Sequence, residues 1–200
     1  MVNIAVFASG YGSNLQAIID AIESGKLTAK IQLVFSDKKD VYALERAKKH
    51  NIPTLYLPPK EFPSREEHEK KIVEHLEQLG VELIVLAGYM RILTPYIIRR
   101  YHLKIINIHP ALLPSFPGTH GIEDAFNHGV KYTGVTVHFV DEGVDTGPII
   151  TQEAVKIEAG DTIETLEPQI HAIEHQLYPQ VLQWFSEQRV KVEGRKVRII

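Results

Sequence analysis

The fold of this 200-residue chain is decided by the stretch Ile105-Ile106-Asn107-Ile108-His109-Pro110. It is an apolar run of β type that carries two polar side chains two residues apart. Residues i and i+2 of a strand point to the same face, so Asn107 and His109 are expected to project together. Pro110 has no N–H to donate and therefore ends the strand. Ligands bind at the carboxyl ends of strands in open α/β sheets, which makes this pair the first candidate for a functional site.

Apolar runs alternate with segments of helical period on the N-terminal side of this stretch. Strands are expected near 3–8, 31–36, 54–57 and 83–87, and helices near 14–23, 41–50, 65–79 and 95–101. Helix ends have their own signals: a capping box from Ser64 to Glu67, Thr94-Pro95 as N-cap and first helical residue, and stops at Gly25 and Gly80. Repeated βα units predict an α/β fold, an open, mostly parallel, twisted sheet of Rossmann-like type with helices on both faces.

The chain changes character after Pro110, where prolines and glycines crowd together and a loop is expected beside the candidate pair. Strands over 134–140 and 149–155, joined by a turn-rich link, are expected to be antiparallel neighbours. A long helix over 162–188 should begin with a capping box from Asp161 to Glu164 and be kinked or split at Pro168. A small hairpin is expected around Gly194. We predict a single domain, 1–200, with halves at 1–100 and 101–188 and a hairpin or tail at 189–200.

The composition excludes several classes of protein. The chain has 22 Lys and Arg against 25 Asp and Glu, a formal charge of −3, which disfavours a nucleic-acid partner. It has no cysteine, so disulfides, thiolate zinc sites and cysteine nucleophiles are excluded. The apolar start, 1–8, lacks the basic region of a signal peptide, and no apolar run approaches the roughly 18 residues of a membrane helix. We therefore expect a cytoplasmic protein with no membrane partner.

A glycine-containing turn, Ser9-Gly10-Tyr11-Gly12-Ser13-Asn14, follows the first strand. Glycines let a backbone approach a ligand closely, and the N–H groups at a helix N-terminus attract an anion. Leu15 stands where a dinucleotide fingerprint has its third glycine, and the lysine of a P-loop is missing. The turn therefore favours a small phosphomonoester over NAD or ATP. The alternative is an ordinary βα turn that caps the helix well.

Asn107 and His109 together suit a carbonyl substrate whose oxygen becomes negative during reaction. The amide donates a hydrogen bond, and the imidazole donates a hydrogen bond or a proton. Asp145, in a turn flanked by glycines, is expected to return in space and orient the histidine. The alternative is a polar pair whose hydrogen bonds are satisfied at the end of a sheet. Arg91, just past another strand, suits either a substrate carboxylate or a surface salt bridge.

The other histidines need separate interpretation. His171 and His175 have helical i, i+4 spacing, but no glutamate follows His171 and no third ligand is evident, so no metal site is expected. His120 lies in the loop and His138 lies on a strand near the candidate site. Both are expected to contact the reacting side chains and not the substrate itself. The remaining five lie in charged surroundings and are expected to be solvated: His50, His68, His75, His102 and His128.

Four motifs in this order resemble the phosphoribosylglycinamide formyltransferase (glycinamide ribonucleotide transformylase) family, over Val2 to about Trp184. They are 9–14, Leu86-Ala87-Gly88-Tyr89-Met90-Arg91, Asn107-Ile108-His109-Pro110-Ala111-Leu112-Leu113-Pro114, and 138–150. The resemblance implies transfer of a formyl group from 10-formyltetrahydrofolate, a cosubstrate, to the amine of glycinamide ribonucleotide in purine biosynthesis. It implies no metal. We expect the protein to be a monomer or a homodimer.

The resemblance also assigns residues to each part of the reaction. The catalytic residues would be Asn107, His109 and Asp145. The phosphate and ribose of the substrate would be bound by Gly12, Ser13, Asn14 and Glu174. The folate would be bound by Arg65, Met90, Arg91, Ile92, Leu93, Val140, Asp141, Gly143 and Val144. The chain departs from the family pattern at Tyr11, where asparagine is common, at His171 near the phosphate, at Gly121-Ile122, and at Pro168.

Three other functions use part of the same residue set. A 10-formyltetrahydrofolate hydrolase would use the same trio with water as acceptor, and such relatives carry an N-terminal regulatory domain, whereas here a first strand is expected from residue 3. A methionyl-tRNA formyltransferase would need a further C-terminal domain and a basic surface. A non-catalytic phosphosugar-binding module would need only the Gly12-Ser13-Asn14 turn, and would leave Asn107, His109 and Asp145 without a role.

Overall fold

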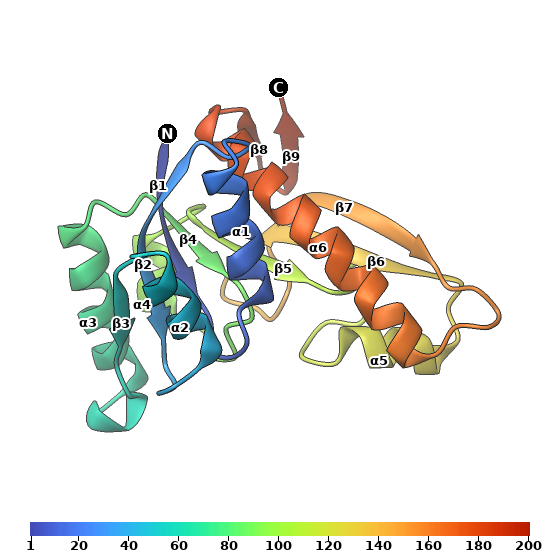
Figure 1. The fold of residues 1–200 in the computed structure, drawn as a ribbon, viewed down its shortest axis with the longest axis horizontal. Helices are drawn as coiled ribbons and strands as arrows, with labels where there is room; N and C mark the ends of the chain where they lie inside the picture. The colour runs from blue at the N-terminus through green and yellow to red at the C-terminus, as the bar shows by residue number, and fades with distance from the viewer. The chain divides into compact units, whose positions relative to one another are not determined.

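Seven strands follow one another in the order β3-β2-β1-β4-β5-β6-β7, and two more form a separate pair, β8-β9 (Figure 1). The computed structural model describes residues 1–200, which form two compact units, 1–106 and 107–200. Strand β5 (Ile105–His109) passes from the first unit into the second. The predicted fold class, a mostly parallel sheet with helices, is confirmed.

Strands and helices alternate in the first unit. The elements are β1 (Val2–Phe7), α1 (Ser13–Glu23), β2 (Ala29–Ser36), α2 (Tyr42–Lys49), β3 (Thr54–Tyr56), η1 (Pro59–Glu61), α3 (Arg65–Gln78), β4 (Leu83–Leu86) and α4 (Pro95–Arg100). β1 pairs in parallel with β2 and with β4, and β2 pairs in parallel with β3. The side chains from Ile4 to Phe7 are fully buried, as a central strand with both faces covered requires.

Helix ends in the first unit follow the predicted signals with one correction. The Ser64 hydroxyl accepts a hydrogen bond from the Glu67 N–H at 3.1 Å and caps α3. Gly25 and Gly80 have φ of +73° and +64°, the left-handed conformation that ends a helix. Thr94 stands at the N-cap of α4, but its hydroxyl donates to the Glu69 carboxylate instead of capping the helix. Glu69 is buried, and a buried carboxylate needs such donors.

His68 was expected in solvent, and this prediction is wrong. Its side chain is buried, its Nε2 lies 3.0 Å from the Leu57 carbonyl oxygen, and its ring packs edge-on against Phe62. His68 lies one helical turn before the buried Ile72, so the helical period places both on the same face of α3. Of the two charged residues that flank His68 in sequence, Glu67 is exposed, whereas Glu69 is buried like His68 itself.

The second unit contains the remaining elements. They are α5 (Gly121–His128), β6 (Tyr132–Phe139), β7 (Ile149–Lys156), α6 (Ile163–Ser186), β8 (Val190–Glu193) and β9 (Lys196–Ile199). β6 and β7 are antiparallel neighbours, as predicted, and α6 packs against both of them. α5 packs against α6, and β9 lies against β7. The sequence analysis missed α5, a short helix that begins where the loop rich in proline and glycine ends.

The predicted N-cap of α6 is wrong, and the helix is not split at Pro168. Its N-cap is Thr162, which exchanges hydrogen bonds with Thr165, while Asp161 accepts from the Glu158 N–H outside the helix. α6 also continues without a break through Pro168 and through Pro179. Each proline removes a single backbone hydrogen bond from a 24-residue helix, and packing against β6 and β7 holds the rest together. No helix has both the length and the apolar character that crossing a membrane would require.

Candidate active site

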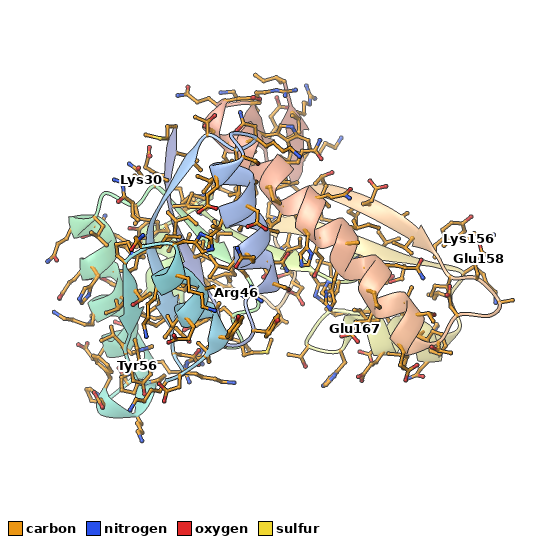
Figure 2. The ribbon with its side chains drawn as sticks, in the orientation of Figure 1. Lys30, Arg46, Tyr56, Lys156, Glu158 and Glu167 are labelled. Carbon is orange, nitrogen blue, oxygen red and sulfur yellow. The ribbon has the colours of Figure 1, made fainter.

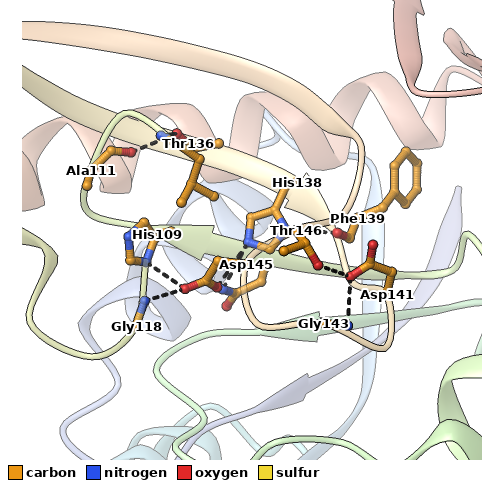
Figure 3. A network of polar contacts seen from close by, with 12 residues as sticks. His109, Ala111, Gly118, Thr136, His138, Phe139, Asp141, Gly143, Asp145 and Thr146 are labelled. Atoms are coloured by element: carbon orange, nitrogen blue, oxygen red, sulfur yellow. Dashed lines mark hydrogen bonds and ion pairs between the residues drawn. The ribbon is translucent and has the colours of Figure 1, made fainter. Parts of the chain in front are cut away.

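Four side chains of the second unit form a chain of polar contacts at the carboxyl end of β5 (Figure 3). The Asn107 amide nitrogen lies 3.3 Å from His138 Nε2, and His138 Nε2 lies 3.5 Å from Asp145 Oδ1. The other oxygen of Asp145, Oδ2, lies 3.5 Å from His109 Nδ1. Both histidines are almost completely buried, with 3% and 2% of the side chain exposed for His109 and His138. The predicted trio is thus brought together, with His138 as the link.

The loop after β5 supplies two further groups to this cluster, both from the backbone. His109 Nε2 donates to the Phe116 carbonyl oxygen at 2.7 Å, and the Gly118 N–H donates to Asp145 Oδ2 at 2.8 Å. Both ring nitrogens of His109 therefore face an oxygen. An imidazolium has an N–H on each ring nitrogen and could donate a hydrogen bond to both oxygens. The sequence analysis missed Phe116 and Gly118, because a backbone group leaves no signal in residue type.

The loop that carries Asp145 is held in shape by its own side chains. Asp141 Oδ1 accepts from the Gly143 N–H at 3.1 Å and from the Thr146 hydroxyl at 2.6 Å. Asp145 itself has φ of +54°, which is uncommon for a residue other than glycine. The guanidinium of Arg195, between β8 and β9, donates to the Thr146 carbonyl at 2.9 Å. The C-terminal hairpin thus contacts the residue next to Asp145.

A buried threonine on β6 fixes the start of the loop after β5. The Thr136 hydroxyl donates to the Ala111 carbonyl at 2.7 Å and accepts from the Leu113 N–H at 3.1 Å. Gln152 on β7 donates to the same hydroxyl and to the Leu113 carbonyl, at 3.0 and 2.8 Å. These bonds fix the backbone at Ala111 and Leu113, two and four residues after His109.

Hydrogen bonding keeps Asp145 ionised in spite of its burial. Burial alone would raise the pKa of the carboxyl group, but hydrogen bonds from His138 and from the Gly118 N–H, with the charges of both histidines, lower it below its ordinary value. His138 Nδ1 lies 2.8 Å from the Phe139 carbonyl, which accepts its proton. His138 Nε2 lies between the Asn107 amide nitrogen and Asp145 Oδ1, at 3.3 and 3.5 Å, so the imidazole links these two side chains.

The first unit contains the predicted phosphate turn. Gly12 stands at the N-cap of α1 with φ of +76°, and a Cβ at this position would lie 2.8 Å from the Cβ of Ala43. Only glycine therefore fits where the turn meets α2, and Ser13 and Asn14 open α1. The backbone N–H groups of this first helical turn are suited to bind an anion.

Ser9 connects this turn to the segment proposed to bind folate. Its hydroxyl donates to Asp37 at 2.6 Å and accepts from the Met90 N–H at 3.0 Å. Beyond Met90, the Arg65 guanidinium donates to the Ile92 carbonyl. Met90, Ile92 and Arg65 are exposed, Arg91 is partly exposed, and Leu93 is buried. In the second unit, Gly143 and Val144 are exposed, and Val140 and Asp141 are partly so.

Glu174 and His171 form a pair on α6. Glu174 is buried, and its Oε2 lies 2.8 Å from His171 Nδ1, while Glu167 lies 3.4 Å from His171 Nε2. The hydrogen bond from Glu174 raises the pKa of His171, against the opposing effect of burial, and Glu167 adds to the rise. The ring of His175 stacks on that of His171. No group of three or more His, Cys, Asp or Glu side chains in the chain is arranged to hold a metal ion.

His120 stands at the N-cap of α5, where it is exposed and lies 3.6 Å from Glu123. Gly121, its neighbour, lies so close to His109 that a Cβ there would be 3.1 Å from the imidazole Nε2. The glycine that departs from the family pattern is therefore the residue that contacts His109, and His120 points to Glu123 instead.

Comparison with known proteins identifies the family. Residues 2–182 match the family model described as formyl transferase. A phosphoribosylglycinamide formyltransferase of Bacillus subtilis (strain 168) is 47% identical over 182 residues, 91% of this chain and 93% of the relative. Glycinamide ribonucleotide transformylase 1 from Symbiobacterium toebii is 45% identical, with a TM-score of 0.96 over 100% of this chain and 94% of its own. A formyltetrahydrofolate deformylase from Pseudomonas syringae pv. tomato str. DC3000 is 30% identical, with a TM-score of 0.91 over 100% of this chain and 66% of its own. The chain belongs to the formyl transferase family.

Proposed function

We propose that this chain transfers the formyl group of 10-formyltetrahydrofolate to the amine of glycinamide ribonucleotide, with Asn107, His109 and Asp145 as its catalytic residues. The observation that carries the proposal is the continuous polar contact from Asn107 through His138 and Asp145 to His109, at the carboxyl end of β5. This contact lies within the 2–182 match to formyl transferases. Two of the three relatives named above are a phosphoribosylglycinamide formyltransferase and a glycinamide ribonucleotide transformylase, at 47% and 45% identity.

The reaction begins when the substrate amine attacks the formyl carbon. The amine must be neutral, which is easily met near pH 8 for an α-amino group. Attack gives a tetrahedral intermediate with a negative oxygen, and the Asn107 amide and the His109 imidazolium donate hydrogen bonds to it. In the structure His109 Nε2–H is bound by the Phe116 carbonyl, so the formyl oxygen takes the place of that carbonyl as acceptor.

Collapse of the intermediate breaks the bond between the formyl carbon and N10 of the folate. A proton must pass from the attacking amine to the departing N10, and Asp145 assists this transfer through a water molecule. Its carboxylate also balances the positive charge of His109, whose Nδ1 lies 3.5 Å away. The products are the ribonucleotide with its amine converted to a formamide, and tetrahydrofolate, whose N10 has taken up the proton.

Other residues would hold the two substrates. The Gly12-Ser13-Asn14 turn binds the phosphate, and Glu174, which pairs with His171, binds the ribose. Arg91 and Arg65 bind the glutamate end of the folate. The pterin is bound by Met90, Ile92, Leu93, Val140, Asp141, Gly143 and Val144. The enzyme works in the cytoplasm, without a nucleic-acid or membrane partner. It is a monomer or a homodimer, and light scattering measures which of the two it forms.

One assay separates this function from its alternatives. The protein is given 10-formyltetrahydrofolate with and without glycinamide ribonucleotide, and tetrahydrofolate and free formate are both measured. Loss of formyl that requires the amine and releases no formate is the expected result. Formate release without the amine would instead support a hydrolase, the activity named for the Pseudomonas syringae structure. Binding of the ribonucleotide without turnover would support a phosphosugar-binding module.

Replacing Arg195 with alanine is expected to lower kcat/KM for 10-formyltetrahydrofolate about threefold to tenfold, because the charged hydrogen bond to the Thr146 carbonyl is lost beside Asp145. Steady-state kinetics with the ribonucleotide held saturating measure the change. Arg198→Ala is the matched control, since Arg198 lies on the same hairpin and pairs with Glu193. Equal kinetic constants for the two variants would show that the hairpin does not help to hold the loop that carries Asp145.

The lowered pKa of Asp145 also predicts how stability depends on pH. Folding lowers the pKa below 3.8, so the folded state binds fewer protons at this group and its ionised form stabilises the fold above that pH. The contribution is lost as the pH falls through the lowered value. Urea unfolding of the wild type and of Asp145→Asn should show a difference in free energy that is constant from neutral pH to about pH 5 and shrinks in stronger acid. A difference that grows on acidification would contradict this.

A further inference from the structure

The guanidinium of Arg46, which Figure 2 labels on α2, is bound to the turn that precedes α1. Its Nε donates to the Tyr11 carbonyl at 3.0 Å, and one terminal nitrogen donates to Gln16 Oε1 at 3.0 Å. Tyr11 lies inside the turn and Gln16 lies in the first part of α1. One side chain of α2 therefore holds the last residue before Gly12 and the helix that follows it.

Two tyrosine rings hold the guanidinium in turn. The rings of Tyr11 and Tyr42 stack with their centroids 5.1 Å apart and 18° between their planes. Arg46 Cζ lies 4.5 Å from the centroid of each ring. Tyr11 and Tyr42 are 68% and 40% exposed as residues, so this cluster lies at the surface of the unit. A planar cation can stack on aromatic rings while its N–H groups donate in its own plane, which a lysine cannot do.

The backbone of the turn also lies directly on α2. The Ala43 N–H donates to the Gly10 carbonyl at 3.1 Å, and Gly12 approaches Ala43 too closely for any side chain. Arg46 lies three residues after Ala43, on the same side of the helix. The turn is thus fixed on α2 at Gly10, at Tyr11 and at Gly12, and Arg46 provides the side-chain part of that attachment.

We propose that Arg46 is a positioning residue for the substrate phosphate. It holds the Tyr11–Asn14 backbone in the binding conformation before the substrate arrives, so that binding does not have to order a glycine-containing turn. This inference rests on the proposed function, in which the turn binds the phosphate. Arg46 acts through the turn and not as a phosphate ligand, because its Nε and a terminal nitrogen are committed to Tyr11 and Gln16.

Replacing Arg46 with alanine is expected to weaken binding of glycinamide ribonucleotide roughly tenfold, equivalent to about 1.4 kcal/mol, with kcat and the KM for the folate little changed. Calorimetry with the ribonucleotide in the absence of folate measures the affinity directly, and steady-state kinetics separate KM from kcat. Hydrogen exchange of the substrate-free variant should be faster over residues 10–14, and saturating ribonucleotide should slow it again.

Two further variants separate positioning from charge. Arg46→Lys keeps the charge but loses the planar group, so it is expected to bind as weakly as Arg46→Ala. Lys49→Ala removes a charge whose Nζ also lies over the Tyr42 ring, 5.1 Å from its centroid, and it is expected to bind as the wild type does. Wild-type affinity in Arg46→Lys together with weakened binding in Lys49→Ala would overturn the inference in favour of a simple charge effect.

Gly12→Ala tests the proposed function independently, because the added Cβ would displace the turn from Ala43. If Gly12→Ala binds the ribonucleotide normally, the turn is not the phosphate site and the proposed function fails at this point. If Gly12→Ala weakens binding and Arg46→Ala does not, the phosphate site stands and only the inference about Arg46 is overturned.

Discussion

Replacing Asn107 with alanine is expected to lower kcat about 10²- to 10³-fold, the loss typical when one donor to a developing oxyanion is removed. The amide of Asn107 is held by His138 Nε2 at 3.3 Å, so it is oriented before the substrate binds and requires no rearrangement during the reaction. The effect should therefore fall on kcat, with KM for both substrates changed little. Rapid-quench measurement of a single turnover reports the chemical step itself.

Asn127→Ala provides the control for this experiment, because it removes the same side chain from an exposed position on α5 in the same unit. It should leave kcat unchanged. Melting temperatures of both variants show whether the fold is intact. A single-turnover rate for Asn107→Ala within threefold of the wild type would mean that the formyl oxygen takes its hydrogen bonds from other groups.

The placement of Asn107 and His109 at a strand end could be predicted from sequence because both signals are local. The alternation of side chains along a strand places Asn107 and His109 on the same face of the sheet. Pro110 ends the hydrogen-bond ladder of the strand because it has no N–H. The Gly12 turn is similar, since glycines between a strand and a helix are a local pattern; in the structure Gly12 has φ of +76°, and a Cβ there would lie 2.8 Å from the Cβ of Ala43. Such features depend on a few consecutive residues and on the geometry of a single element.

The partners of these residues could not be predicted in the same way. Asp145 meets His109 only because its loop is closed by Asp141 and turns back through a residue with positive φ. His138 was assigned a supporting position, but its place between Asn107 and Asp145 depends on how β6 lies beside β5. Contacts between segments 30 or more residues apart are set by packing, to which residue patterns are only weakly sensitive.

The helix caps show the same limit on a smaller scale. Asp161 and Thr162 are both good N-cap residues, and the capping-box spacing fits either one, with Glu164 or with Thr165 as its partner. The structure selects Thr162, because Asp161 is used by the Glu158 N–H and the Thr165 hydroxyl. At Thr94 the buried Glu69 carboxylate takes the hydroxyl that would have capped α4. Competition for the capping side chain decides both cases: nearby donors occupy Asp161, and the distant Glu69 carboxylate occupies Thr94.

Replacing Asp145 with asparagine is expected to lower kcat about 10²- to 10⁴-fold, the range for loss of a group that assists proton transfer. Asparagine keeps the shape of the side chain and an oxygen that can accept from the Gly118 N–H. It removes the negative charge beside His109 and places an N–H₂ group toward one of the histidines. The ribonucleotide and the folate should still bind with nearly unchanged affinity, so the loss should appear in turnover.

Asp124→Asn, on the exposed face of α5, is the matched control for loss of a carboxylate in the same unit, and it should retain full activity. The pattern of loss in Asp145→Asn distinguishes two roles of the carboxylate. If Asp145 moves the proton, the variant should be slow at every pH, because an amide cannot take part in that transfer. If it only keeps the loop closed through Gly118, the asparagine still accepts that bond and kcat should stay near the wild-type value, which would eliminate Asp145 from the chemistry.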